Sequence, residues 1–137
     1  MSDRVFVDTN VLVYAFDRDE PVKRKRSLAI LADGDDLVLS TQVLQEFYVT
    51  VTRKLRRPVS EPDAEAAVRD LAQLEVVTVD KNTVLQAISI SRTRVLSFWD
   101  SLVVCSASMA GCARLLSEDM QHSRQIEGVT IVNPYAP

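Results

Sequence analysis

Residue types that build several common kinds of site are scarce in this chain. Its 137 residues include only two cysteines and one histidine, too few for the Cys and His sets that bind structural zinc. Cys105 and Cys112 do not form a Cys-x-x-Cys pair. If one helix carried both, they would lie ~10 Å apart along its axis, too far for a disulfide bond. We therefore expect reduced thiols and a cytoplasmic protein.

Glycine and long apolar runs are also rare. The three glycines form no phosphate-binding loop, repeat or linker, and the N-terminal residues lack the basic region and apolar core of a signal peptide. The most apolar stretch, 95–111, carries Asp100 near its middle and falls short of the ~18 uncharged residues that a membrane span needs. We expect a single globular domain over residues 1–137, without membrane association.

Positive net charge is missing as well. The formal charge is −3, which by itself argues against nucleic-acid binding. Two basic clusters, Lys23–Arg26 and Arg53–Arg57, stand out against it. They are either solvated helix faces or a basic rim around an acidic centre, and composition leaves both interpretations open.

Short apolar runs alternate along the chain with helical patterns. Strands are predicted over Arg4–Val7, Asp36–Ser40, Glu75–Val79, Ala113–Ser117 and Val129–Val132. Helices are predicted over Val11–Phe16, Val22–Asp33, Thr41–Leu55, Ser60–Leu74, Lys81–Ser91 and Ser97–Ala110. Continuous apolar strands separated by helices are typical of an α/β protein whose parallel sheet is covered on both faces.

Two aspartates follow predicted strands. Asp8 ends the first strand and Asp119 follows the fourth. Open parallel sheets bind ligands beyond the carboxyl ends of their strands, so both acids are candidates for a site. Asp8 is equally suited to cap a helix, and Asp119 to form a polar turn. Alternation alone does not say whether Glu118 or Asp119 points into a pocket.

Asp100 carries the strongest physical signal. In a helix it shares a face with Val103, Val104 and Ala107, and that helix is apolar almost all round, which predicts burial. A buried carboxylate is costly unless it is paired, hydrogen-bonded or bound to a metal. Alternatively, Ser97 and Asp100 form a capping box.

Glu46 is the weakest candidate by pattern. On a helical wheel it lies opposite the apolar stripe that includes Leu44, Phe47 and Val51, so by pattern it faces solvent. Four carboxylates brought together would repel each other, and a divalent cation would relieve that repulsion. All-oxygen ligands suit Mg²⁺ or Mn²⁺. Without these acids and Glu118, the remaining charge of the chain turns positive.

Several segments together resemble the PIN-domain family, and within it the VapC-type toxins. The matching segments are 7–10 with Leu12, 40–47, 98–102, 116–122 and 133–134. They extend over nearly the whole chain, from residue 5 to residue 135, and their order and spacing carry the resemblance. In one departure, similar proteins tend to have glycine after the Gln-His pair where this chain has Ser123, so we expect a differently shaped turn there.

The resemblance implies a fold, a site and an activity. The fold is a five-stranded parallel sheet of order 3-2-1-4-5, in which the first strand lies beside the fourth. The site is a Mg²⁺ or Mn²⁺ pocket formed by Asp8, Glu46, Asp100 and Asp119, with Thr9, Asn10 and Ser117 orienting the carboxylates or contacting phosphate. The activity is endoribonucleolytic hydrolysis by the toxin of a type II toxin–antitoxin pair. The implied partners are an RNA substrate, a small antitoxin protein and a second copy of the chain.

Two alternatives remain at this stage. One is a catalytically silent PIN module that binds RNA or protein. The other is a phosphotransfer or phosphatase domain, because such α/β folds also gather aspartates at strand ends. A dehalogenase-like enzyme would have a second acid in place of Asn10, and a receiver domain would have a lysine where this chain has Asn133-Pro134-Tyr135.

Overall fold

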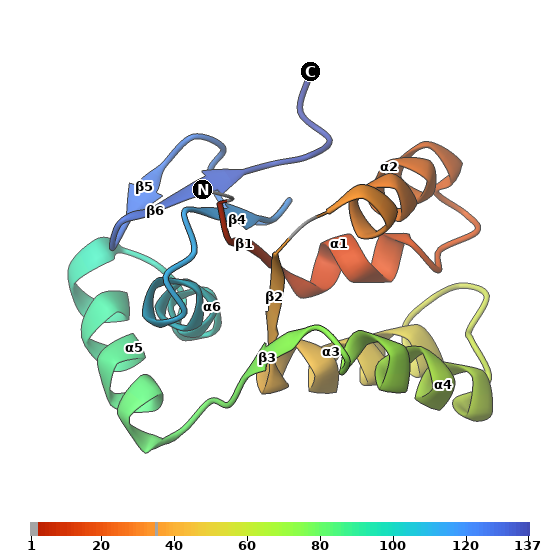
Figure 1. Ribbon diagram of the computed structural model, residues 1–137, viewed down its shortest axis with the longest axis horizontal. Helices are drawn as coiled ribbons and strands as arrows, with labels where there is room; N and C mark the ends of the chain where they lie inside the picture. Colours follow the sequence, from red (N-terminus) through yellow and green to blue (C-terminus); the bar gives the residue numbers. More distant parts are fainter. Residues whose placement is uncertain (1–2, 35) are drawn as a thin grey trace.

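The computed structural model describes residues 3–34 and 36–137 (Figure 1). The strands are β1 (Val5–Val7), β2 (Leu37–Ser40), β3 (Glu75–Val77), β4 (Arg114–Leu116), β5 (Gln125–Ile126) and β6 (Val129–Val132). The helices are α1 (Thr9–Tyr14), α2 (Pro21–Asp33), α3 (Thr41–Arg53), α4 (Glu61–Leu71), α5 (Lys81–Arg94) and α6 (Phe98–Met109).

The sheet has the order β3-β2-β1-β4-β6-β5. β1 pairs in parallel with β2 on one side and with β4 on the other, and β4 pairs in parallel with β6. The predicted order 3-2-1-4-5 is therefore confirmed, with β6 as the fifth predicted strand. Because β1 and β4 are neighbours, the loops that follow them start at the same edge of the sheet.

Helices cover both faces of this sheet (Figure 1). α1, α2, α3 and α4 lie on one face, where α1 contacts α2 and α3, and α3 contacts α4. α5 and α6 lie on the other, and α6 contacts β2, β4 and β6. The core between the layers is apolar, and its largest fully buried side chains include Phe6 and Phe47. The three-layer α/β prediction is confirmed.

The sixth strand was missed because its turn has an unusual sequence. β5 pairs with β6 in antiparallel orientation through the two residues Glu127 and Gly128, which have positive φ angles of 53° and 80°. Two-residue hairpins need this backbone, and Asn-Gly or Asp-Gly is its usual signature. Because glutamate occupies the first turn position, the usual signature is absent and the hairpin was not predicted. The prediction of an all-parallel sheet was therefore wrong at this edge, where β5 is antiparallel to β6.

Three further expectations need correction. The fifth predicted helix continues to Arg94, beyond Ser91, and ends where Val95 takes a left-handed backbone conformation. The apolar helix α6 is not buried all round, because the Trp99 side chain near its start is 62% exposed. The turn at Ser123 was expected to differ from one with glycine. Ser123 instead adopts a φ of 71°, the left-handed conformation that glycine would favour.

Within the described ranges, none of the helices is long and apolar enough to cross a membrane. Cys105 and Cys112 are both buried and free, as expected. Cys112 lies beyond the end of α6, in the turn that leads to β4.

Candidate active site

Asp8 lies at the carboxyl end of the central strand, where the structure confirms the capping role that its position suggested. It is the N-cap of α1, and its Oδ1 accepts a hydrogen bond of 2.7 Å from the backbone N–H of Thr9. Its Oδ2 accepts hydrogen bonds from the Ser117 hydroxyl at 2.8 Å and from the Asn10 amide at 3.3 Å. Only 5% of Asp8 is exposed, so this carboxylate is fixed by protein groups rather than by water.

Burial makes Asp8 hard to ionise. Its pKa is raised to about 6, chiefly because burial penalises the charged form, and the carboxylates of Asp119 and Glu46 add like-charge repulsion. The hydrogen bonds from Ser117 and Thr9 oppose this rise without cancelling it. A partner of positive charge would stabilise the ionised form.

Glu46 reaches the same region from α3. Its Oε1 accepts a hydrogen bond of 2.9 Å from the hydroxyl of Thr9. The helical wheel placed this side chain toward solvent, but α1 lies against α3 and covers that direction. A helical wheel describes a single helix, so it could not predict the contact between Glu46 of α3 and Thr9 of α1.

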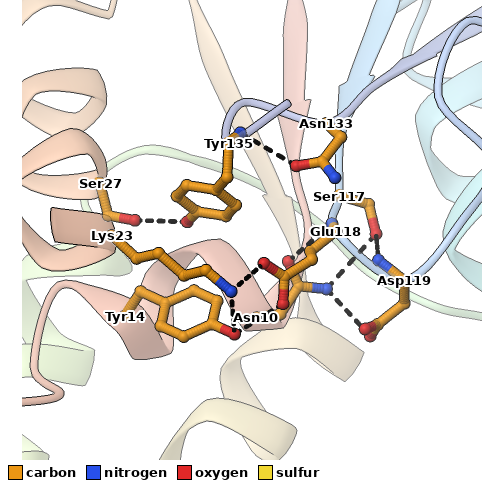
Figure 2. A network of polar contacts seen from close by, with 9 residues as sticks. All are labelled: Asn10, Tyr14, Lys23, Ser27, Ser117, Glu118, Asp119, Asn133 and Tyr135. Atoms are coloured by element: carbon orange, nitrogen blue, oxygen red, sulfur yellow. Dashed lines mark hydrogen bonds and ion pairs between the residues drawn. The ribbon is translucent and has the colours of Figure 1, made fainter. Parts of the chain in front are cut away.

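Asp119 is joined to Asp8 through an amide. The Nδ2 group of Asn10 donates to Asp119 Oδ2 at 3.0 Å and to the Ser117 hydroxyl (Figure 2). The same group donates to Asp8 Oδ2. The backbone N–H of Asp119 also donates to Ser117 at 3.2 Å. Asn10 and Ser117 thus link the loops that follow β1 and β4.

The structure separates Glu118 from Asp119. Asp119 points to Asn10, whereas the Glu118 carboxylate turns away toward Tyr14 and Lys23 (Figure 2). The choice that alternation left open therefore falls on Asp119.

Asp100 approaches from the opposite helical layer. Its backbone N–H donates to the Ser97 hydroxyl at 3.1 Å, so the capping interpretation of Ser97 is correct. Asp100 is half-buried. Its pKa is raised by burial and then by the nearby charges of Asp119 and Glu46, against a hydrogen bond with Ser97. Asp100 is therefore close enough to Asp119 and Glu46 to feel their charges.

The two helices α1 and α3 form the walls of a groove of about 620 Å³ that opens at this site. Thr9, Asn10, Glu46 and Asp119 line it beside the edge of the sheet. The helices run from that edge in the same direction, so Asp17 and Lys54 line the distant end. Neither the buried Asp8 nor Asp100 lines the groove.

The chemistry of the four carboxylates suits a hard divalent cation, although their side chains do not converge on one point. Asp8, Glu46, Asp100 and Asp119 offer only oxygen, the ligand type that Mg²⁺ and Mn²⁺ prefer. Within residues 3–34 and 36–137, no group of three His, Cys, Asp or Glu side chains is already spaced to hold one ion. The buried Asp8, whose charge is opposed by two other acids, is the observation that favours a cation here.

Three residues near the acids were not assigned to the site from the sequence. Lys23, Tyr14 and Tyr135 come from three separate segments and meet beside Glu118 (Figure 2). Lys23 belonged to a basic cluster, which predicted a solvated or RNA-facing side chain. Only the packing of α2 and the C-terminal segment around α1 brings these groups together.

A sequence profile of the PIN domain matches residues 5–126. The chain belongs to the PIN domain family. A search among curated proteins found no match for this PIN domain.

Solved structures support the fold assignment. Mycobacterium tuberculosis VapC20, described as a toxin that cleaves the sarcin-ricin loop, is 17% identical with a TM-score of 0.67, over 84% of this chain and 89% of that one. A toxin–antitoxin complex from Klebsiella pneumoniae is 17% identical with a TM-score of 0.71, over 96% and 98% of the two chains.

A third structure, VapBC2 from Rickettsia felis bound to a promoter DNA fragment, is 16% identical with a TM-score of 0.63, over 93% and 96%. At these identities the likeness establishes that the PIN domain described here has the same fold.

Proposed function

We propose that this PIN domain is a metal-dependent endoribonuclease, and that it acts as the toxin of a type II toxin–antitoxin pair. The observation that carries the proposal is the buried carboxylate of Asp8, whose pKa is raised by burial and by the charges of Asp119 and Glu46, the same two acids that raise the pKa of Asp100. The toxin assignment rests on the family and on the described roles of the similar structures.

Asp8 and Asp100 would hold the main Mg²⁺ or Mn²⁺ ion, and Glu46 and Asp119 would complete the pocket. When bound, such an ion activates water, orients the phosphodiester and stabilises the leaving oxygen. Thr9 binds one carboxylate oxygen of Glu46 and Asn10 binds one of Asp119. Among the described residues, no hydrogen bond engages the other oxygen of either side chain. These free oxygens are suited to accept a proton from, or to orient, an attacking water.

The remaining polar groups would hold the acids in place. Ser117 and the backbone of Thr9 fix Asp8, and the Asn10 amide sets the separation of Asp8 from Asp119. The RNA strand would enter along the groove between α1 and α3, where Lys54 offers positive charge for a phosphate at the end distant from the acids.

Cleavage of RNA tests the catalytic part of this proposal. The purified protein should cleave single-stranded RNA with Mg²⁺ or Mn²⁺, and EDTA should abolish the activity. Asp8→Asn and Asp100→Asn should each reduce the rate at least ~100-fold, because each removes a charged ligand. Asp70→Asn, an exposed acid on α4, is the matched control and should cleave normally.

Full activity in Asp8→Asn or Asp100→Asn would refute this site. If wild-type protein binds RNA without cleaving it under either metal, a silent RNA-binding module replaces the enzyme. Metal binding has a separate readout, since Mn²⁺ should raise the melting temperature of the wild type and not that of Asp8→Asn.

The toxin assignment is tested in cells. Expression of the chain should arrest growth, and co-expression of a small antitoxin protein encoded beside its gene should restore growth. Expression of Asp8→Asn should be harmless. Growth arrest by Asp8→Asn at equal protein levels would contradict a nuclease toxin.

A further inference from the structure

Glu118 stands next to Asp119 in the chain, yet its charge is directed out of the acidic site. Its Oε2 forms an ion pair of 2.6 Å with the Lys23 ammonium, and its Oε1 accepts a hydrogen bond of 2.6 Å from the Tyr14 hydroxyl. Both carboxylate oxygens of Glu118 are therefore bound by groups that lie away from the acidic site.

Lys23 is held from several directions. Besides Glu118, its ammonium donates to the Tyr14 hydroxyl at 3.3 Å. It lies 4.8 Å from the centre of the Tyr14 ring and 5.6 Å from that of Tyr135, which are cation–π distances. Tyr135 is fixed in turn by a 2.6 Å hydrogen bond between its hydroxyl and that of Ser27. A lysine held in this way is poorly placed to contact RNA.

The backbone of Glu118 connects this cluster to the acids. Its N–H donates to the Oδ1 of Asn10 at 3.1 Å, which leaves the Nδ2 group of Asn10 facing Ser117 and Asp119 (Figure 2). Nδ2 also donates to Asp8. The orientation of the Asn10 amide thus depends on where the loop of residues 117–119 lies. The side chain of Glu118 ties that loop to α1 through Tyr14 and to α2 through Lys23.

We propose that Lys23 is a positioning residue of the active site, which acts through Glu118 to hold Asn10 and Asp119 in register with Asp8. It also neutralises a fifth carboxylate that would otherwise add to the repulsion among the acids. The proposal rests on the nuclease function proposed above. It differs from the expectation that the whole basic cluster binds the RNA backbone, because Lys23 is assigned to the protein's own loop.

Kinetics of Lys23→Met separate these roles. The variant should lower kcat about 10-fold, equivalent to ~1.4 kcal/mol of barrier, and leave KM for RNA within about twofold, because no substrate contact is lost. The Kd for the same RNA, measured with EDTA so that no cleavage occurs, should also stay within about twofold. Lys81→Met, at an exposed position at the start of α5, is the control and should change neither quantity.

A double-mutant cycle tests whether Lys23 acts through Glu118. Glu118→Gln should lower kcat by a similar factor, and the double variant Lys23→Met/Glu118→Gln should be no slower than the worse single variant. Multiplicative losses would overturn the route through Glu118. Melting curves verify that each variant is folded. If Lys23→Met does not fold, Lys23→Arg takes its place and, because it keeps the charge, should retain part of the wild-type kcat.

A readout without catalysis keeps this proposal distinct from the nuclease proposal. In a ¹H–¹⁵N spectrum, the side-chain amide signals of Asn10 should move in Lys23→Met and stay in place in Lys81→Met. If wild-type protein cleaves no RNA while Asn10 responds in this way, the positioning role stands and the enzymatic one fails. An unmoved Asn10 signal, or a raised KM with unchanged kcat, would overturn the role assigned to Lys23.

Discussion

Asp8 combines a structural and a chemical role at one position. Its carboxylate caps α1, an interaction that favours the ionised form, while its burial favours the protonated form. Burial dominates, so the folded protein binds a proton at Asp8 more tightly than the unfolded chain does. Ionised Asp8 is therefore a source of instability until a cation compensates its charge.

Stability should consequently depend on pH through this residue. Between the ordinary aspartate pKa and about 6, the folded state holds more protons than the unfolded state, so the free energy of unfolding falls as pH rises through that window. Above it, Asp8→Asn should be more stable than the wild type by ~1–3 kcal/mol in the absence of divalent ions. Near pH 4 the two proteins should differ little.

Urea denaturation with EDTA at pH 7.5 and pH 4 measures this difference. Asn at position 8 can still accept from the Thr9 N–H and donate to the Ser117 hydroxyl. It loses only the long 3.3 Å hydrogen bond from the Asn10 amide, so the comparison reports mainly on the charge. A variant less stable than the wild type at pH 7.5 would contradict the assigned cause.

At the residue scale, some of the site could be predicted and some could not. Asp8 and Asp119 follow strands, so their meeting depends only on β1 and β4 being adjacent, and Asp100 stands out as an acid in an apolar helix. Glu46 depends on the packing of α1 against α3, and the divergence of Glu118 from Asp119 depends on Lys23 and Tyr14. Such contacts join distant segments, which local periodicity does not describe.

Elements end in this protein for different local reasons. Serine side chains cap α3, α4 and α6 at their starts, and the predicted starts lie within one residue of those observed because capping is local. The ends were predicted less well, since α3 ends at Arg53 and α4 at Leu71 instead of Leu55 and Leu74. Gly34 ends α2 with a φ of −73°. This backbone conformation is open to any residue, so it does not explain why glycine occupies the position. A Cβ there would lie 2.6 Å from the carbonyl oxygen of Ile30 and 2.7 Å from a methyl of Leu37.

Gly34→Ala should therefore destabilise the connection between α2 and β2. The expected loss is ~1–3 kcal/mol, because the backbone at Ile30 must shift to accommodate the methyl group. Thermal denaturation measures the effect, with Ala66→Ser at an exposed position of α4 as the control. Unchanged stability of Gly34→Ala would mean that the close approach relaxes freely.

The whole molecule leaves apolar side chains uncovered on the layer formed by α5 and α6. Leu85 and Ile88 on α5 are 58% and 43% exposed, and Trp99 at the start of α6 is 62% exposed. Leu85 and Ile88 lie on one face of the helix, since they are three residues apart. A second copy of the chain would cover such a face, in line with the homodimer that the family resemblance implies.

Light scattering tests this assembly. The wild type should have twice the 15.3 kDa mass of one chain, and Leu85→Glu/Ile88→Glu should shift it toward the monomer, because charge at a dimer interface is costly to desolvate. Glu substitutions at the exposed Ala66 and Arg69 of α4 provide the control. A monomeric wild type at micromolar concentration would contradict the homodimer.

The joint between α5 and α6 has a consequence for how much heat the protein tolerates. Val95 has a φ of 54° there and is 90% exposed, so a branched side chain adopts a left-handed backbone without any burial in return. That conformation costs roughly 1–2 kcal/mol in an L-residue other than glycine or asparagine. A single replacement by asparagine would release this strain and raise the melting temperature by a few degrees.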